Sequence, residues 1–370
     1  MSDNADALIA LVDGEDINQV TRMVKELDPI AMPSQHDEEL RQENTSDNHF
    51  ARATSKINVY EKIPFAGGDG DYSILSVLFG AHSIGEGIFG YLNMIDSNKV
   101  RVQCVECRKA VMDFPWLDID SRIKGSVSAW RTAFPVARAV NVSYRYDLDD
   151  ADFAHIRGDA RVRLHSVNMD GCRAVTDAAF IHLRGINTLY MYSCNQETIT
   201  DAAFVHLRGI HKLNMSRCNQ ATITDAAFVH LRGIHTLLIR GCSQISITDV
   251  AFESLRKIHT LDMNSCDQET ITDAAFVHLR GINTLNIGWC NQITITDAAF
   301  THLRGVQTLQ MGFCDQITIT KVAIANLAGI ALLDTASCVR DVRLAAALVL
   351  GVEYESDADF EAGDGDGGTE

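Results

Sequence analysis

The chain is short of basic residues. Its 370 residues contain 32 lysines and arginines against 49 aspartates and glutamates, so the formal net charge is −17 at pH 7. Nucleic-acid binding needs clustered lysines and arginines that neutralise phosphates, so we expect no nucleic-acid partner. Long apolar runs are also missing: Ala7–Val12 has no basic leader and is too short for a signal peptide or a membrane span. We therefore expect an intracellular protein, in the cytoplasm or nucleus, with no membrane contact.

The patterns of catalytic and metal sites are missing as well. Cys104 and Cys107 form a C-x-x-C pair, but no second pair follows at zinc spacing. The glycine-rich stretch 67–71 is not followed by the Lys-Ser/Thr of a phosphate loop. No set of nucleophile, base and orienting residue stands out. We expect a non-enzymatic protein with no catalytic residue, no cofactor and no metal.

A repeat of 24 residues dominates the second half of the chain. Cysteines occur at positions 194, 218, 242, 266, 290, 314 and 338, and leucines keep the same step at 189, 213, 237, 261, 285 and 309. Self-similarity at such a period is the sequence signature of a solenoid, in which each unit stacks on the next.

One unit, Ile199–Cys218, predicts the local structure of all of them. Leu213–Met215 alternates apolar and polar residues, which predicts a short strand. Thr200 or Asp201 suits the N-cap of a helix of one to two turns, and Gly209 suits its left-handed end. Phe204 lies on the face of that helix that should pack against the strand.

The pattern L-x-L-x-x-C-x-x-x-x-I-T-D resembles the cysteine-containing class of leucine-rich repeats, over roughly residues 140–340. The resemblance implies an α/β solenoid with a curved parallel sheet on its concave side and short helices on its convex side. The unit at 242–265 departs most from the others, and Lys321 replaces the usual aspartate. The departures at 242–265 are Val250, Glu253, Ser254 and Lys257, in place of Ala, Val, His and Gly.

The three recurring columns of polar residues are each explained without a metal. Cysteines on neighbouring strands lie about 4.8 Å apart, more than the roughly 3.8 Å Cβ separation of a disulfide, so we interpret them as buried free thiols. Thiols in a straight column cannot surround zinc tetrahedrally. Histidines 182, 206, 230, 278 and 302 have no carboxylate at a fixed spacing, and the aspartates at 177, 201, 225, 249, 273 and 297 mark helix starts.

A second resemblance precedes the repeats. Ile88-Phe89-Gly90-Tyr91-Leu92, then Asp96, Val102-Gln103-Cys104 and Arg108, resembles an F-box, a helical module that docks on the Skp-type adaptor of cullin-RING ubiquitin ligases. The resemblance implies an all-α module over residues 74–120. Its adaptor-binding residues would be Ile84, Ile88, Phe89, Tyr91 and Leu92. The alternative is that these residues are only the apolar face of a helix.

Composition divides the remainder of the chain. We expect a flexible, partly disordered region at 1–73, a linker at 121–139 and a first strand at Val140–Val142. The apolar run Leu344–Leu350 predicts a C-terminal cap over 341–355 that covers the last repeat. Residues 356–370 form an acidic tail that we expect to be disordered.

The units vary most at the polar positions of each strand, whereas the helical side is almost unchanged. Alternate strand positions share a face, so the variable residues should line the concave side, and Trp289 and Phe313 should form an aromatic step at its rim. The residues predicted to contact a protein substrate are Tyr190, Tyr192, Asn214, Arg240, Asp262, Asn264, Asn286, Trp289, Gln310 and Phe313. Random drift is the alternative, but it would vary both sides equally.

An F-box followed by leucine-rich repeats implies a substrate-recognition adaptor of an SCF-type (Skp-cullin-F-box) ubiquitin ligase. Its partners would be the Skp-type adaptor with its cullin ligase, and a protein substrate. Two alternatives stay open at this point. One is an interaction scaffold with no link to a ligase, and the other is an enzyme whose site is not recognised.

Overall fold

The computed structural model describes residues 94, 97, 105–157 and 163–352, which all belong to one compact unit, Tyr91–Glu370. The predictions for the N-terminal region, for most of the F-box-like segment and for the acidic tail lie outside the described residues. So do the expected adaptor-binding residues Ile84, Ile88, Phe89, Tyr91 and Leu92.

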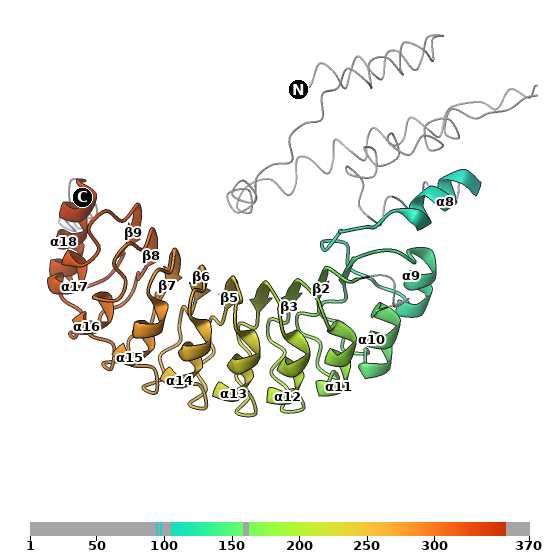
Figure 1. Ribbon diagram of the computed structural model, residues 1–370, viewed down its shortest axis with the longest axis horizontal. Coiled ribbons are helices and arrows are strands. Elements are labelled where there is room, and N and C mark those ends of the chain that lie inside the picture. Colours follow the sequence, from blue (N-terminus) through green and yellow to red (C-terminus); the bar gives the residue numbers. More distant parts are fainter. Residues whose placement is uncertain (1–93, 95–96, 98–104, 158–162, 353–370) are drawn as a thin grey trace, which may run out of the picture. The chain divides into compact units, whose positions relative to one another are not determined.

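Nine short strands in the described part of the chain form one parallel sheet in which sequence order equals spatial order (Figure 1). They are β1 (Ala139–Asn141), β2 (Ser166–Asn168), β3 (Thr188–Tyr190), β4 (Lys212–Asn214), β5 (Thr236–Leu238), β6 (Thr260–Asp262), β7 (Thr284–Asn286), β8 (Thr308–Gln310) and β9 (Leu332–Asp334). The repeated leucines lie side by side, with Leu189 opposite Leu213 and Leu213 opposite Leu237. The 24-residue period therefore corresponds to one coil of a solenoid, as predicted.

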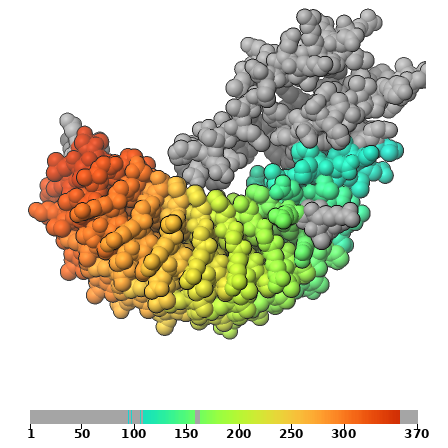
Figure 2. Space-filling model, viewed as in Figure 1, coloured from blue at the N-terminus to red at the C-terminus, as the bar shows by residue number. Residues whose placement is uncertain are grey.

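Helical segments lie on the other side of each coil. They are α10 (Asp150–Arg157), α11 (Asp177–Phe180), α12 (Asp201–Phe204), α13 (Asp225–Phe228), α14 (Asp249–Phe252), α15 (Asp273–Phe276), α16 (Asp297–Phe300) and α17 (Lys321–Ala325). Five of them continue as 3-10 turns: η2 (Ile181–Leu183), η3 (Val205–Leu207), η4 (Val229–Leu231), η5 (Glu253–Leu255) and η6 (Val277–Leu279). In Figure 1 the strands follow the inner side of the arc from β2 to β9, and helices α11 to α16 follow its outer side. The coils form adjacent ridges in the space-filling view (Figure 2).

The strands begin one residue earlier than the sequence predicts. In the coil of β4 the strand is Lys212–Asn214 rather than Leu213–Met215, and β1 likewise begins at Ala139. The chain leaves the extended conformation at Arg217, whose φ of 57° is left-handed. Hydrogen bonding between coils continues up to this turn, since the N–H of Arg217 donates to the carbonyl of Arg240 at 2.8 Å.

Apolar columns between sheet and helices form the core. Phe204, Leu213 and Met215 are each 0 % exposed, and the phenylalanines of five further coils repeat that burial. A single coil leaves these side chains open on both sides, so burial depends on stacking the next coil.

The aspartate that begins each short helix is bonded to the following coil. The side chain of Thr200 caps helix α12, which fits the predicted N-cap. Asp177 of the preceding coil accepts the N–H of Thr200 at 2.7 Å and its hydroxyl, also at 2.7 Å. The same pair of bonds recurs coil by coil to Asp297 and Thr320. The sequence predicted these aspartates only as helix starts, and the structure shows that they also tie one coil to the next.

Eight cysteines of the described chain form a column of free, buried thiols. Each thiol donates to a backbone carbonyl of the preceding coil, at sulfur to oxygen distances of 3.0–3.2 Å. Burial raises the pKa of Cys242 to about 12, so this group stays a neutral thiol at neutral pH. Within the described ranges, no group of three or more histidine, cysteine or acidic side chains could hold a metal ion.

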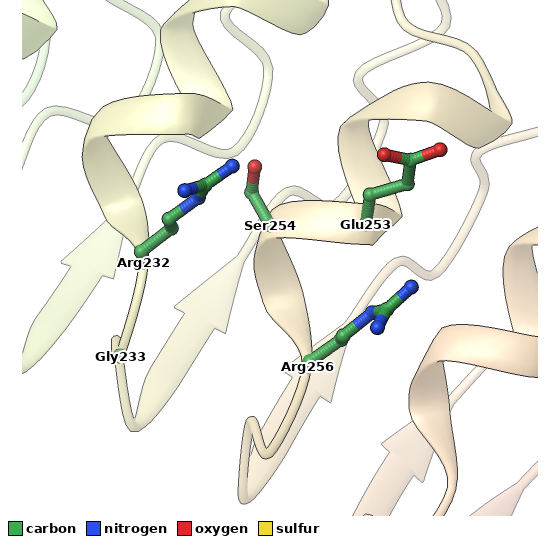
Figure 3. Close-up of a pocket in the computed structure, with 5 residues that line it drawn as sticks. All are labelled: Arg232, Gly233, Glu253, Ser254 and Arg256. Carbon is green, nitrogen blue, oxygen red and sulfur yellow. The ribbon is translucent and has the colours of Figure 1, made fainter.

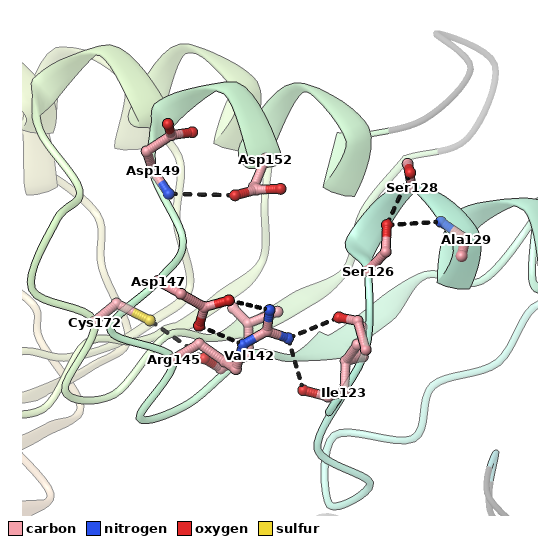
Figure 4. A network of polar contacts seen from close by, with 11 residues as sticks. Ile123, Ser126, Ser128, Ala129, Val142, Arg145, Asp147, Asp149, Asp152 and Cys172 are labelled. Atoms are coloured by element: carbon pink, nitrogen blue, oxygen red, sulfur yellow. Dashed lines mark hydrogen bonds and ion pairs between the residues drawn. The ribbon is translucent and has the colours of Figure 1, made fainter.

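The first strand is covered by the segment before it. This segment holds α8 (Val105–Asp113) and α9 (Val127–Ala133), so the predicted linker at 121–139 contains a helix. The buried guanidinium of Arg131 donates to the carbonyls of Phe134, at 3.2 Å, and Ala137, at 2.9 Å. Arg145 forms a two-point ion pair with Asp147, at 2.7 and 2.6 Å, and also binds the carbonyl of Ile123 (Figure 4). These bonds satisfy backbone carbonyls at the open end of the solenoid.

Helix α18 (Arg340–Leu350) covers the other end, where the sequence predicts a cap. It packs on α17 and β9, and Val342 and Ala346 are its buried residues. In the described part of the chain, no helix has the length and hydrophobicity to cross a bilayer.

Candidate binding surface

The candidate site is the inner face of the sheet, where side chains from neighbouring coils come side by side. We call it the inner surface and define it by the ten residues predicted to contact a substrate. The structure leaves Arg240, Trp289, Gln310 and Phe313 exposed, and Tyr190, Tyr192, Asn214 and Asn264 half-buried. Asp262 and Asn286, at 5 % and 8 % exposed, are buried. Eight of the ten residues are therefore accessible to a partner.

Asp262 and Asn286 are buried because they hold the turn that follows each strand. The side-chain oxygen of Asn286 accepts the N–H of Gly288 at 2.9 Å, and Asp262 accepts the N–H of Asn264 at 3.2 Å. Asn214 makes the same bond to Ser216, at 3.0 Å. Side chains of Asn and Asp commonly stabilise a turn in this way. Asp262 and Asn286 therefore support the turn, and their predicted contact with a substrate stays a prediction.

Arg240 is the exposed cation at the centre of the inner surface. Its guanidinium forms an ion pair with the carboxylate of Asp262 in the next coil. The arginine side chain is 58 % exposed and the aspartate side chain 7 %. Because the arginine end of the pair is open to solvent, the pair adds little stability, and its main effect is to fix where the arginine points.

Two tyrosines at the N-terminal part of the surface are covered by cations from the next coil. The ammonium of Lys212 lies 5.7 Å from the centre of the Tyr190 ring. The guanidinium of Arg217 lies 5.6 Å from the centre of the Tyr192 ring. These distances suit cation–π attraction, which orders long side chains that would otherwise be free.

Trp289 and Phe313 are the most unusual residues of the surface. Their rings stack with centroids 4.2 Å apart and planes inclined by 9°, while 49 % and 41 % of the two residues is exposed. Both have a left-handed backbone, with φ of 60° and 62°. Five other coils place glycine or serine at this left-handed position, namely Gly171, Ser193, Gly241, Ser265 and Ser337, and a further coil places Arg217 there. The left-handed conformation costs of order 1–2 kcal/mol for a residue with a Cβ, so the fold holds these aromatics outward at an energetic cost. Strain of this kind is a pointer to function.

Glycine at position 288, next to the aromatic pair, leaves no side chain above the sheet at that point. A Cβ on Gly288 would lie 2.8 Å from the amide nitrogen of Asn264 and 3.2 Å from the carbonyl of Gly312. No side chain fits at 288 unless its neighbours shift. The position therefore leaves Asn264 accessible next to Trp289.

The surface combines aromatic rings, one fixed guanidinium and several amides. Such a combination is typical of protein-binding surfaces, where Trp, Tyr and Arg supply most of the affinity. Sequence analysis missed the Arg240–Asp262 pair and the stacked imidazoles of His211, His235 and His259, whose ring centres lie 4.5 and 4.4 Å apart. A signal existed for the histidines, because one residue type recurs at one position in three successive coils.

Comparisons with known proteins identify the fold. No protein-family model and no curated protein matches the sequence. Among solved structures, TLR13 in complex with ssRNA13 matches at 16 % identity with a TM-score of 0.50, over 62 % of this chain and 34 % of that one. Toll of Drosophila in its complex with Spatzle matches at 14 % identity with a TM-score of 0.44, over 61 % and 33 %. Yeast Rad7 in complex with Elc1 matches at 14 % identity with a TM-score of 0.35, over 80 % and 98 %.

The first two of these matches involve only about a third of the known protein's length. The likeness to TLR13 concerns the fold alone. Together with nine parallel strands at regular steps in the described chain, it shows that this part of the chain is a leucine-rich-repeat solenoid.

Proposed function

We propose that the inner surface binds a protein partner, and that the chain acts inside the cell as a non-catalytic recognition subunit. The observation that carries this proposal is the stacked pair Trp289–Phe313, exposed and held in a strained backbone. Arg240, fixed by Asp262, adds a charged contact a few coils away. A leucine-rich-repeat solenoid offers such residues on a continuous, rigid surface.

We propose further that the partner is a substrate of an SCF-type ubiquitin ligase. This step rests on the F-box-like segment around Ile88–Leu92, which precedes the solenoid in the sequence. The chain would contribute proximity, because holding substrate and ligase together makes the transfer effectively intramolecular. The second candidate is an interaction scaffold without a ligase link, which needs only the leucine-rich-repeat solenoid and its inner surface.

The surface assignment is tested by the double substitution Trp289→Ala with Phe313→Ala. Aromatic anchors often contribute about 2 kcal/mol or more, so quantitative affinity purification should show partners reduced by at least about tenfold. Val205→Ala is the matched control, because it removes an exposed apolar side chain on the helical side of a coil. Equal partner recovery with the double variant and the control would exclude the inner surface as the binding site.

The ligase link is tested separately by deletion of residues 84–108. The intact chain should co-precipitate purified Skp-type adaptor, and the deleted chain should not. Retention of the protein partner by both forms, with adaptor bound by neither, would support the scaffold instead.

A further inference from the structure

One coil breaks the pattern on the helical side of the solenoid. In five coils a histidine follows the short helix, and in three of them the arginine of the preceding coil donates to its ring. The Nε of Arg184 lies 2.9 Å from Nδ1 of His206, and the Nε of Arg208 lies 3.2 Å from Nδ1 of His230. In the coil that contains η5 the histidine is replaced by Ser254.

Among the described residues, Arg232, which precedes Ser254, forms no bond of this kind, and neither does Arg256, although His278 follows it in the next coil. Within the part of the chain that the structure describes, the guanidinium groups of Arg232 and Arg256 form no hydrogen bond or ion pair. A cavity of about 340 Å³ lies beside Ser254, between the two coils. It is lined by Arg232, Gly233, Glu253, Ser254 and Arg256 (Figure 3).

Ser254 places a hydroxyl on the wall of the cavity. The residue is 6 % exposed, and its hydroxyl makes no hydrogen bond to any described residue. In Figure 3 the hydroxyl and the guanidinium of Arg232 point toward one another across the cavity. A ligand in the cavity would accept a hydrogen bond from this hydroxyl in place of water.

The same coil departs from the repeat at one more residue, which directly follows Arg256. Lys257 has a left-handed φ of 70° at a position where the other coils place glycine. A residue with a Cβ is strained there, and this one adds a positive charge beside Arg256. The departures of this coil add a negative charge at Glu253 and a positive charge at Lys257, so the positive groups that line the cavity are Arg232 and Arg256.

We propose that this cavity binds an oxyanion of the phosphate type. Arginine forks are suited to phosphate oxygens and a serine hydroxyl donates one more bond. The anion would lie between Arg232 and Ser254, because the carboxylate of Glu253 occupies the far side of Ser254 (Figure 3). Arg256 adds charge without a competing partner. The site lies on the opposite side of the coil from the inner surface and is independent of the proposed function.

The two sources of such a group are a phosphorylated side chain of another protein and a free phosphate. Both can be compared by isothermal titration of the full chain, with a phosphoserine peptide in one arm and inorganic phosphate in the other. Saturable binding of either ligand supports the site, and the ligand with the lower dissociation constant identifies the source. Absence of saturation for both below about 10 mM would overturn the proposal.

Ser254→His is the decisive variant, because it restores the residue of the other coils. It should fold normally, give Arg232 a ring nitrogen to bond and fill the cavity. We expect it, and Arg232→Gln, to weaken binding by about tenfold, which is the loss of one charge-assisted contact. The matched control is Arg208→Gln, since that arginine faces a histidine and lines no cavity of this kind. Unchanged binding by Ser254→His, or an equal loss in Arg208→Gln, would show that general charge attraction and not this cavity binds the anion.

Discussion

At the scale of single residues, the repeated aspartate has two roles: it begins a helix and it binds a threonine of the next coil. One carboxylate of each coil accepts both the N–H and the hydroxyl of a threonine in the next. That threonine in turn caps its own helix. A single side chain therefore couples the start of one helix to the start of the next.

Asp225→Ala should show this coupling in the free energy of unfolding. The change leaves the N–H and hydroxyl of Thr248 without their acceptor. Hydrogen bonds to charged groups contribute about 1.5–3 kcal/mol, so we expect a loss of about 2 kcal/mol in urea denaturation. Lys321→Ala is the control, because Lys321 occupies the same position in its coil but has no carboxylate. A loss in Asp225→Ala no larger than in the control would contradict the coupling.

At the scale of the element, the repeat predicted the coil well, because period and core pattern are local properties of the sequence. The Leu189 and Leu213 columns, the buried Phe204 and the Thr200 cap all follow from one unit. The burial of Asp262 did not follow, since it depends on the turn bond to Asn264 and on the ion pair with Arg240 of the preceding coil. The sequence showed that Ser254 replaces a histidine, but it did not predict the cavity. The cavity is formed only when Arg232 of the preceding coil lies next to Ser254.

Deletion of one whole coil tests whether each coil is a self-contained element. Removal of residues 195–218 joins Cys194 to Asn219, so every later coil meets its neighbour in the same register. We expect a folded protein with lower stability and a smaller denaturant m-value, because m scales with the surface exposed on unfolding. Deletion of only 195–206 removes half a coil and should abolish cooperative unfolding, as measured by circular dichroism. Equal behaviour of the two deletions would refute coil-by-coil stacking.

At the scale of the whole molecule, the buried thiols act as one column that runs from Cys172 to Cys338. Burial is the largest cause of a raised pKa in all eight. It raises the pKa of Cys172 and Cys338 to about 11, and that of Cys242 and Cys314 to about 12. In the unfolded chain these groups return to the ordinary cysteine pKa of about 8.5.

Stability should therefore fall in alkaline solution. Below about pH 8.5 the thiols are protonated in both states, and their burial is fully favourable. As the pH rises from 8.5 toward 11, the unfolded chain loses protons that the folded chain keeps, so each thiol lowers the free energy of unfolding by up to about 1.4 kcal/mol per pH unit. Urea titrations at pH 8, 9 and 10 measure this slope, and Cys242→Ala isolates one thiol because alanine cannot titrate. We expect the variant to be less stable than wild type at pH 8 but to lose less stability between pH 9 and 10, and parallel curves would mean that this thiol is not held protonated by the fold.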